Sequence, residues 1–558
     1  MSKEASLSTR IADLRENPKS QVLIIGGGIN GLAVFRDLAL QGVDVVLVEK
    51  NDYCSGASAA SSHMIHGGVR YLENGEIRLV KESLQERNRL LAAAPHYVKP
   101  LKTTIPIFSV FSGLLSAPIR LFTHSQGKPK ERGAILIKVG LILYDVFGRN
   151  AGTLPRHRFL GKKKSMQEMP HLNKDVKFTA TYYDAAMESP ERLALEVLFD
   201  GLAAGKNARA FNYVSVASMS RNGVILKDEL SGETFSFSSD VIVNTTGPWT
   251  DLTNQALGYS TSYMAGTKGS HIVLENKELF EACDNRELFF ENQDGRIVLM
   301  YPILGKVLVG TTDIPHDMSQ PAVCTDDEVE YFFKLVSHVY PNIKLDRSQI
   351  VYRYSGVRPL GASGDINPGV ISRDYRIVRT SAENEVPVLS LVGGKWTTFR
   401  ALGEHLSGEV LKLLGLARKV STANLPLGGG KGFPTDPEGQ LVWAEQHRQT
   451  VPTERSLQLL LRYGTRATAV LSMIAAKGEK RLSSHPEFTD TEIEYLIERE
   501  QVCQVEDIVQ RRTNLAFTGE ASPQLIKELE EISHRFHSWG EGQSEGFIQQ
   551  KAMKAGGR

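Results

Sequence analysis

Residues 21–49 read QVLIIGGGINGLAVFRDLALQGVDVVLVE, and the architecture of the chain can be followed outward from them. Residues 21–25 form a short apolar run of the kind that fills a buried parallel strand. A glycine-rich turn follows, then apolar residues at helical spacing, and residues 43–48 form a second apolar run. This order predicts a strand, a helix and a second strand, which is the repeating unit of a doubly wound α/β fold.

The turn after the first strand has the pattern GxGxxG. Gly26 permits the tight turn, Gly28 lets a pyrophosphate approach the backbone, and Gly31 lets the helix pack closely on the strand. The helix then presents free N–H groups and the positive end of its dipole to phosphates. Glu49 ends the second strand, where a carboxylate can accept hydrogen bonds from ribose hydroxyls. The pattern predicts dinucleotide binding, but it does not separate FAD from NAD.

The bulk composition fits a folded protein of more than one domain. The chain has 558 residues, of which 41% are hydrophobic and 23% charged, and its formal net charge is +1. This length suggests two or more domains, and the near-neutral charge argues against the basic profile of a nucleic-acid-binding protein. The four cysteines lie far apart without a CxxC pair, so we expect no metal site and reduced thiols.

We expect a cytoplasmic protein, peripheral on the cytoplasmic face of the inner membrane. The first twenty residues have no apolar core of signal-peptide length, and no run of about 18 apolar residues predicts a spanning helix. In residues 105–147, two apolar and aromatic stretches flank the basic segment THSQGKPKERG. This arrangement is typical of an interfacial segment with basic anchors. A buried helical pair joined by a basic loop is the alternative.

Residues 51–73 read NDYCSGASAASSHMIHGGVRYLE and are unusual after a second strand. A plain NAD enzyme would proceed to another strand and helix at this point. Small residues and hydroxyls can instead lie against a cofactor and donate hydrogen bonds to it. A flexible Gly/Ser linker is the alternative, and the dense block of His, Arg, Tyr and Glu at the end of the segment argues against it.

At this point the sequence resembles the FAD-dependent glycerol-3-phosphate dehydrogenases, within the wider group of amine- and hydroxy-oxidising flavoproteins. The resemblance covers residues 21–517, and its motifs occur in the order of that family. They are VLIIGGGINGLAVFRDLALQG, SSHMIHGGVRYLE, VIVNTTGPW (241–249), KGSHIVL (268–274), LVGTTDI (308–314), YSGVRPL (354–360), ISRDY (371–375) and LVGGKWTTFR (391–400), with IEYLIEREQVCQVEDIVQRRTNLAF in the C-terminal helical part.

The resemblance implies a Rossmann-like, doubly wound FAD-binding domain, an α+β substrate domain and a C-terminal helical domain. It implies oxidation of sn-glycerol 3-phosphate to dihydroxyacetone phosphate by hydride transfer to the flavin, with the electrons passed to a membrane quinone. It also places residues 51–73 along the flavin, with Arg70 and Tyr71 reaching the substrate.

The residues expected to hold FAD come from four parts of the chain. Gly247 would let the chain approach the cofactor from the side opposite the first turn. A helix that begins near Phe399 would point its positive dipole end at the flavin and stabilise charge on the reduced ring. A structural turn and a plain helix cap are the respective alternatives. The expected contacts are Gly26, Gly28, Asn30, Gly31, Glu49, Ser58, Ser61, Ser62, His66, Gly68, Gly247, Gly394, Thr397 and Thr398.

A phosphate dianion needs several cationic donors, and Arg358, Arg373 and Lys395 each stand beside turn residues late in the chain. Together with Arg70 they form the phosphate cluster that the family context favours. Read singly, each would be a surface ion pair. Thr311 offers a hydroxyl to the substrate or to the flavin.

Oxidation of a secondary alcohol also requires a base for the hydroxyl proton, and a group with a near-neutral pKa suits this step. We predict His271 as this base or as the hydroxyl partner. His66 is an alternative. Arg358 is a poor base because its guanidinium keeps its proton, but it can polarise the hydroxyl as a cation. A core position at a strand end is the structural alternative for His271.

The domain boundaries follow from these motifs. Residues 21–98, 179–255 and 350–415 are predicted to build the FAD-binding domain, and residues 99–178 and 256–349 the substrate-binding and membrane-associating domain. Residues 416–436 are a Gly/Pro-rich linker, residues 437–535 a helical domain and residues 536–558 a loose tail.

Two departures from the family pattern concern the substrate. His63 stands where the pattern has Lys, and Ala57 and Ala59 stand where it has more hydroxyls. Residues 188–193, ESPERL, form a segment one residue longer than its counterpart. A longer polyol phosphate, such as a tetritol phosphate, is therefore a competing substrate. An oxidase that uses oxygen and a non-catalytic flavin-binding protein are competing functions, and a homodimer is one expectation for the oligomeric state.

Overall fold

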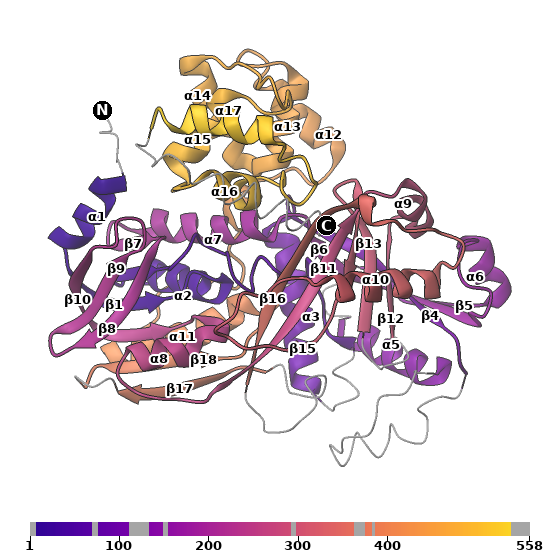
Figure 1. Ribbon diagram of the computed structural model, residues 1–558, viewed down its shortest axis with the longest axis horizontal. Helices are drawn as coiled ribbons and strands as arrows, with labels where there is room; N and C mark the ends of the chain where they lie inside the picture. The colour runs from indigo at the N-terminus through magenta and orange to yellow at the C-terminus, as the bar shows by residue number, and fades with distance from the viewer. Residues whose placement is uncertain are drawn as a thin grey trace.

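The computed structural model describes residues 7–69, 76–110, 133–148, 154–291, 297–361, 374–381 and 385–536 (Figure 1). Two β-sheets lie side by side, and a group of C-terminal helices stands over them. The predicted fold class is confirmed, since a doubly wound sheet, a second mixed sheet and a C-terminal helical region are all present.

The first sheet contains the predicted strand–helix–strand unit. Its strand order is β17-β18-β10-β1-β2-β7, with β9 attached to β10 and β8 to β9. The strands β18, β10, β1, β2 and β7 run parallel. The bounds are β1 (Lys19–Ile25), β2 (Val45–Val48), β7 (Ala208–Phe211), β8 (Val214–Ser220), β9 (Gly223–Asp228), β10 (Thr234–Asn244), β17 (Arg376–Ser381) and β18 (Pro387–Val392).

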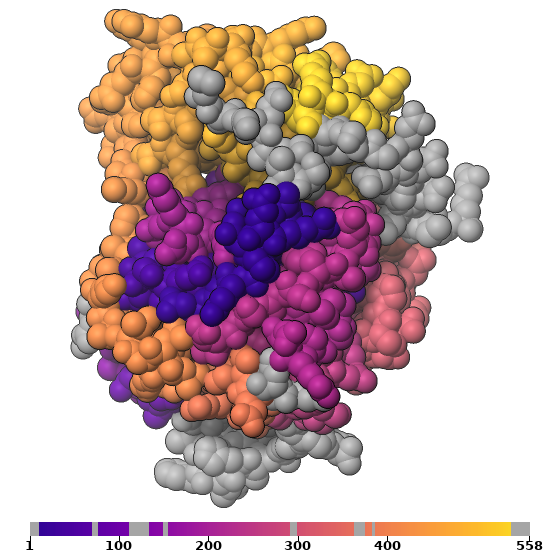
Figure 2. Space-filling model, turned by 90° about the vertical axis from the view of Figure 1, so that its left-hand side faces the viewer, coloured from indigo at the N-terminus to yellow at the C-terminus, as the bar shows by residue number. Residues whose placement is uncertain are grey.

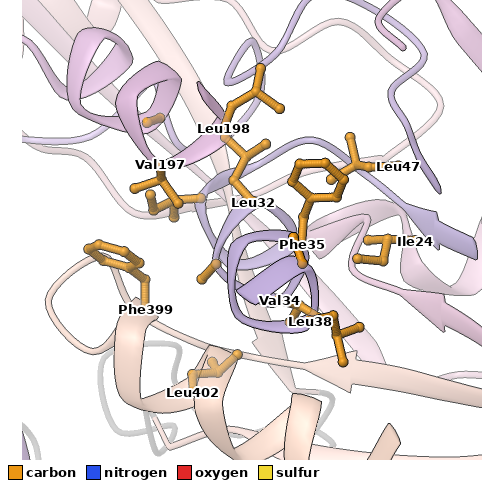
Figure 3. Packing of buried hydrophobic residues seen from close by; sticks show 14 of the residues in the cluster. Ile24, Leu32, Val34, Phe35, Leu38, Leu47, Val197, Leu198, Phe399 and Leu402 are labelled. Atoms are coloured by element: carbon orange, nitrogen blue, oxygen red, sulfur yellow. The ribbon is translucent and has the colours of Figure 1, made fainter. Parts of the chain in front are cut away.

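Both faces of this sheet are covered, which explains why its central strands are apolar throughout. Ile24 points to the face covered by α2 (Ile29–Leu40), α7 (Pro190–Ala204) and α11 (Phe399–Leu414), in a core that also contains Phe35 and Leu402 (Figure 3). Leu23 points to the opposite face, with α1 (Leu7–Glu16), α8 (Thr250–Ala256) and the β8–β9 hairpin. Because side chains alternate between the two faces of β1, successive residues pack into two different hydrophobic cores.

The second sheet has the order β15-β11-β14-β13-β12-β4-β6-β3, with β16 paired to β11 and β5 paired to β6. Most of its neighbours are antiparallel, as in an α+β domain. The bounds are β3 (Met64–Ile65), β4 (Val98–Ile107), β5 (Arg158–Gly161), β6 (Phe178–Met187), β11 (Met264–Leu274), β12 (Arg286–Glu291), β13 (Ile297–Ile303), β14 (Lys306–Gly310), β15 (Ile314–Pro315) and β16 (Ile350–Gly361).

The two faces of the second sheet differ in what covers them. Ile272 packs with α9 (Lys277–Cys283) and α10 (Asp326–Val339) on one face. Val273, the next residue, packs on the other face with Tyr301 and Phe517. The remaining helices that contact the sheet or its edge are α3 (Ile77–Ala93), α5 (Ala134–Gly148) and α6 (Lys162–Glu168).

The C-terminal helices have a hydrophobic core of their own, which contains Leu459, Leu496 and Leu525. They form the orange and yellow group above α7 in Figure 1. Their bounds are α12 (Pro437–Glu445), α13 (Thr453–Tyr463), α14 (Ala467–Lys477), α15 (Asp490–Arg499), α16 (Val505–Asp507) and α17 (Pro523–Ser533), with a π-helical turn η8 (Ile508–Arg512) after α16.

The strand pairing departs from the predicted domain ranges at three strands. β3, β6 and β16 lie within the ranges assigned by sequence to the FAD-binding pieces, but all three pair within the second sheet. An isolated apolar strand carries no information about its sheet, because register is set by distant partners. Within residues 416–436, predicted as a linker, a turn η6 (Gly428–Gly430) packs against α7 and Gly429 donates a hydrogen bond to Glu196.

Candidate active site

The glycine-rich turn brings the first strand and α2 into close approach. Gly26 has a φ of +106° and donates a hydrogen bond from its N–H to Val48 O at 2.9 Å. A Cβ on Gly31 would lie 2.0 Å from Gly26 O. No side chain fits there, so the last glycine of the motif sets the contact between helix and strand.

Two predicted cofactor residues hold this turn from the segment after β2. Glu49 Oε2 accepts a hydrogen bond from Gly27 N at 2.7 Å. Burial raises the pKa of Glu49, while the backbone N–H groups of Asn51 and Gly27 act in the opposite sense. Ser58 Oγ accepts a hydrogen bond from Ile29 N, the first residue of α2, at 3.0 Å.

The end of β18 contributes a third side. Gly394 has a φ of +111°, and a Cβ there would lie 2.7 Å from Asn30 Nδ2. Asn30 Oδ1 is buried and accepts no hydrogen bond from the described residues. An acceptor in this position at the start of α2 suits a ligand with hydroxyl or amide donors, so these residues fit a dinucleotide.

The turn before α11 closes the same region. Thr397 donates a hydrogen bond to His66 O at 3.2 Å, and Trp396 Nε1 donates one to Ser58 O at 2.8 Å. The helix α11 begins at Phe399, as predicted, with Thr398 as its N-cap. Lys395 is half-buried beside this turn. Residues 394–398 therefore lie against the segment that carries Ser58 and His66.

Two further predicted glycines adopt backbone conformations that favour glycine. Gly247 (φ +60°) starts the 3₁₀ turn η3 (Gly247–Trp249), and Pro359 of β16 is the nearest group to its would-be Cβ, at 4.0 Å. Gly68 has a φ of +76° and follows Gly67, whose N–H donates to Asp184 Oδ1 at 3.0 Å. Gly247 thus lies at the boundary between the two sheets.

The predicted catalytic residues share one face of the second sheet. In the register of β11 and β16, His271 lies opposite Tyr354 and Thr267 lies opposite Arg358. Gly269 and Gly356 face each other between these pairs. A Cβ on Gly269 would lie 2.7 Å from Arg358 Nη2, and one on Gly356 would lie 2.4 Å from Ala60 Cβ. The two glycines therefore make room for the guanidinium and for the segment that carries Ser61 and Ser62.

His271 is held by a serine and by a tyrosine ring. Its Nε2 lies 2.8 Å from Ser62 Oγ, and its ring stacks on Tyr354 with centroids 4.9 Å apart. Tyr354 in turn donates its hydroxyl to Ser61 O at 2.7 Å. Burial lowers the pKa of His271 well below 6.5, and the nearby Arg358 and His63 lower it further. The imidazole is therefore neutral at pH 7 and can accept a proton.

Arg358 uses two of its nitrogens within the site. Nη2 donates to Thr311 Oγ1 at 3.0 Å, and Nη1 forms an ion pair with Asp313 Oδ1 at 2.9 Å. These two partners orient the planar guanidinium group of Arg358. A lysine in place of Arg358 could not reproduce this geometry. Thr311, predicted to offer its hydroxyl to the substrate or the flavin, thus lies beside Arg358.

Comparison with known proteins agrees with this geometry. A family model described as FAD dependent oxidoreductase matches residues 21–406, and one described as the C-terminal domain of alpha-glycerophosphate oxidase matches residues 420–544. A glycerol-3-phosphate dehydrogenase of Synechocystis sp. is 35% identical, with 90% of each chain covered. The chain belongs to the FAD-dependent glycerol-3-phosphate dehydrogenase family.

Other members of the family extend this result. A D-erythritol 1-phosphate dehydrogenase of Brucella abortus is 34% identical, over 90% of this chain and 95% of the relative. The X-ray structure of a glycerol-3-phosphate dehydrogenase from Bacillus halodurans complexed with FAD shares the fold, with a TM-score of 0.75, 22% identity and coverage of 98% and 97%. FAD is therefore the cofactor of this family member, and the predicted resemblance is correct.

Some predicted site residues of this family member lie outside the described residues. They are Arg70, Tyr71 and Arg373. The phosphate cluster that Arg70 and Arg373 were predicted to form with Arg358 and Lys395 therefore stays a prediction, as does the substrate contact of Tyr71.

Sequence reasoning missed a carboxylate behind the catalytic face. Glu328 of α10 is buried, and its Oε1 accepts hydrogen bonds from Ser270 Oγ and Thr312 Oγ1, both at 2.7 Å. Its Oε2 lies 2.8 Å from Lys268 Nζ. Burial alone would raise the pKa of Glu328, but these hydrogen bonds outweigh it and the pKa is lowered.

The position of Glu328 links both sides of the site. Ser270 precedes His271, and Thr312 follows Thr311, the partner of Arg358. The capping-box pattern from Thr325 to Glu328 was visible in the sequence. Its connection to β11 was not, because that contact spans 58 residues of the chain.

Proposed function

We propose that the chain oxidises the secondary hydroxyl of sn-glycerol 3-phosphate to the ketone of dihydroxyacetone phosphate. The observation that supports this best is a neutral, buried His271 on the same sheet face as Arg358. The segment 58–62 runs from the N-terminus of α2 to this histidine, since Ser58 contacts Ile29 and Ser62 contacts His271. It therefore links the cofactor turn to the proposed base.

The protein groups divide the chemistry between them. His271 takes up the hydroxyl proton, and Ser62 Oγ together with the Tyr354 ring fixes the orientation of the imidazole. Arg358, held by Thr311 and Asp313, binds the anionic substrate or polarises its hydroxyl. The residues at 26–31, 49, 58 and 394–398 hold FAD, and bound FAD supplies the two-electron acceptor for the alcohol.

Anaerobic reduction of the bound flavin by a panel of substrates is the experiment that tests this function. Glycerol 3-phosphate should bleach the flavin absorbance, and unphosphorylated glycerol should do so far more slowly. A flavin that keeps its colour with every polyol phosphate would refute the proposal and favour a non-catalytic binding role. Gly28→Val should abolish FAD retention, because a side chain would occupy the approach of the pyrophosphate.

The same panel decides the substrate within the class. Relatives at nearly equal identity are named for glycerol 3-phosphate and for D-erythritol 1-phosphate. His63, whose departure from the family pattern made a tetritol phosphate a competing substrate, is buried, and its ring centroid lies 4.9 Å from that of Phe517. We favour glycerol 3-phosphate, and a higher kcat/KM for erythritol 1-phosphate would reassign the substrate to a tetritol phosphate.

We further propose that the electrons pass to a membrane quinone and that α5 rests on the membrane surface. No helix in the described part of the chain is long and apolar enough to cross a membrane. One face of α5 is buried through Leu141 and Tyr144. The other carries exposed apolar side chains at helical spacing, each between 40% and 50% exposed: Ile135, Val139, Ile142, Leu143 and Val146.

A basic residue on α5 supports the membrane surface. Lys138 lies over the ring of Phe159 at 5.7 Å, at the junction of α5 and β5. Lys162, Lys163 and Lys164 follow β5 directly and are exposed. Cations beside an apolar stripe favour an anionic lipid surface.

Liposome flotation tests the membrane proposal. Val139→Asn together with Ile142→Asn should weaken binding to anionic vesicles, while the matched control Leu441→Asn with Val442→Asn, on the equally exposed face of α12, should not. Equal flotation of both variants would reject α5 as the binding surface. Peroxide yield under air, compared with quinone reduction, separates a dehydrogenase from an oxidase.

A further inference from the structure

Asp52 is a buried carboxylate between the cofactor turn and the C-terminal helices. It follows Glu49 by three residues and has no exposed side-chain surface. Arg512 pairs with both of its oxygens, and Arg511 Nε donates to Oδ2 at 2.5 Å. Asn212 Nδ2 donates to Oδ1 at 2.8 Å. Burial alone would raise the pKa of Asp52, but the two guanidiniums hold it below its usual value.

The two arginines can reach the same carboxylate because they lie in the π-helical turn η8. Consecutive residues of an α-helix point about 100° apart, and a π-turn changes this spacing locally. Arg511 also pairs with Asp507 at 2.6 Å, and Arg512 also donates to Glu500 O at 2.7 Å. Asp52 and Asp507 together balance the charge of Arg511 and Arg512, so the buried cluster is neutral.

A second contact joins the same two parts of the chain. Tyr53 is fully buried, and its hydroxyl donates to Gln501 Oε1 at 2.8 Å. Gln501 O accepts a hydrogen bond from Asn212, the residue that also holds Asp52. Figure 2 shows the orange and yellow C-terminal helices above the indigo and magenta parts of the chain.

The other side of this segment holds the glycine-rich turn. The ring of Tyr53 would lie 2.9 Å from a Cβ on Gly27, and Cys54 N donates to Gly27 O at 3.0 Å. Glu49 and Ser58 hold Gly27 and Ile29, as described above. Residues 49–58 therefore form a bracket, here called the cofactor bracket, with the turn on one side and the C-terminal helices on the other.

The C-terminal chain also reaches the catalytic face. Phe517 lies five residues after Arg512 and packs against His63, with ring centroids 4.9 Å apart, and against Tyr354 at 6.5 Å. Tyr354 is the ring on which His271 stacks. One stretch of chain, residues 500–517, thus contacts the support of the cofactor turn and the support of the proposed base.

We propose that the C-terminal domain positions the cofactor bracket through Asp52 and Tyr53, so that its docking and FAD binding are thermodynamically coupled. Coupling of two equilibria is reciprocal. FAD should therefore stabilise the docked C-terminal segment, and weaker docking should weaken FAD binding. The inference rests on the assignment of residues 26–31 as the dinucleotide site.

Titration of FAD onto the apoprotein, followed by quenching of flavin fluorescence, tests this coupling. Asp52→Asn keeps the shape of the side chain but removes its charge, and it should raise the Kd for FAD by about 5- to 150-fold, the usual range of such coupling. Tyr53→Phe removes one hydroxyl and should raise the Kd by a smaller factor. If Asp52→Asn fails to fold, Tyr53→Phe decides the outcome alone.

The matched control is Glu492→Gln. Glu492 is a buried carboxylate that pairs with Arg455 and Arg462 inside the C-terminal domain. Its loss should destabilise that domain internally and leave the Kd for FAD within about twofold. A merely structural role for Asp52 would make the two carboxylate variants behave alike.

Hydrogen exchange provides the reciprocal measurement. In the wild-type protein, FAD should slow amide exchange in residues 500–512, and this protection should be lost in Asp52→Asn. Wild-type FAD affinity in both bracket variants, or exchange in 500–512 that does not respond to FAD, would overturn the proposal. Retention of FAD by Gly28→Val would instead show that the cofactor site itself had been placed wrongly.

Discussion

His271→Gln is the perturbation that tests the proposed base most directly. The substitution keeps a polar group of similar length near Ser62 Oγ, 2.8 Å from the imidazole in the native site, but removes the titratable nitrogen. Loss of a general base typically costs about 10²- to 10⁴-fold in rate. We expect the rate of anaerobic flavin reduction at saturating substrate to fall by this factor, with unchanged flavin content.

The pH dependence gives a second magnitude. A histidine with an ordinary pKa of about 6.5 would keep only about a tenth of its neutral form at pH 5.5. Burial, Arg358 and His63 lower the pKa of His271 well below 6.5. The wild-type rate at pH 5.5 should therefore stay well above a tenth of its value at pH 7.5, and the variant should lose this acid limb altogether.

Stopped-flow measurement of flavin absorbance between pH 5 and 8 provides both numbers. His485→Gln is the matched control. Like His271, His485 has a buried Nδ1 without a hydrogen-bond partner among the described residues, and its ring packs on Phe488 in the C-terminal domain. An acid limb centred at or above pH 6.5, or a loss in His271→Gln no larger than in the control, would refute the assignment of His271 as base.

Three further predictions concern Arg358, Glu328 and His63. Arg358→Gln should lower kcat/KM for glycerol 3-phosphate about 30-fold to several thousand-fold, because the loss of this cation costs about 2–5 kcal/mol. If turnover of unphosphorylated glycerol is unchanged, Arg358 binds the phosphate. If kcat falls equally with glycerol 3-phosphate and with glycerol, Arg358 polarises the hydroxyl. Glu328→Gln should keep FAD but lower kcat at least about fivefold, since misplaced catalytic groups that raise the barrier by about 1 kcal/mol are enough for this loss. The same loss of kcat in Glu492→Gln would mean a general effect on stability. Burial lowers the pKa of His63 to about 4. Between pH 6.5 and about 4 the unfolded chain therefore binds more protons than the folded protein, and the folded protein loses stability as the pH falls. His63→Gln should reduce this loss by up to about 3 kcal/mol, and denaturation midpoints that change in parallel for wild type and variant across this range would contradict the prediction.

The local elements near the cofactor could be predicted because their signals are short-range. The apolar run of β1, the glycine turn and α2 follow each other within about twenty residues, so periodicity and glycine chemistry suffice. The beginning of α11 at Phe399 was predictable for the same reason. Even here, the sequence predicted only that Gly31 allows close packing. The structure showed that Gly26 O is the atom that leaves no room for a Cβ at Gly31.

The allocation of strands to sheets could not be predicted in the same way. β6 and β16 have the composition of any partly buried strand, and they join the second sheet through pairing with β4 and β11. Backbone hydrogen bonds between strands do not depend on side-chain identity, so the choice of partner is decided by the packing of whole layers. The predicted FAD-binding ranges therefore differ from the observed sheets at these strands.

For the site, the sequence by itself determined which residue types were available, and the tertiary structure decided which of them meet. A histidine before an apolar strand and a serine-rich segment were visible from the start, but Ser62 and His271 are 209 residues apart and only the closed sheets bring them to 2.8 Å. Asp52 and Arg512 are separated by 460 residues, and nothing near Asp52 in the chain indicates its partner. Buried polar groups acquire their roles by finding each other away from water, and that requirement acts through space rather than along the sequence.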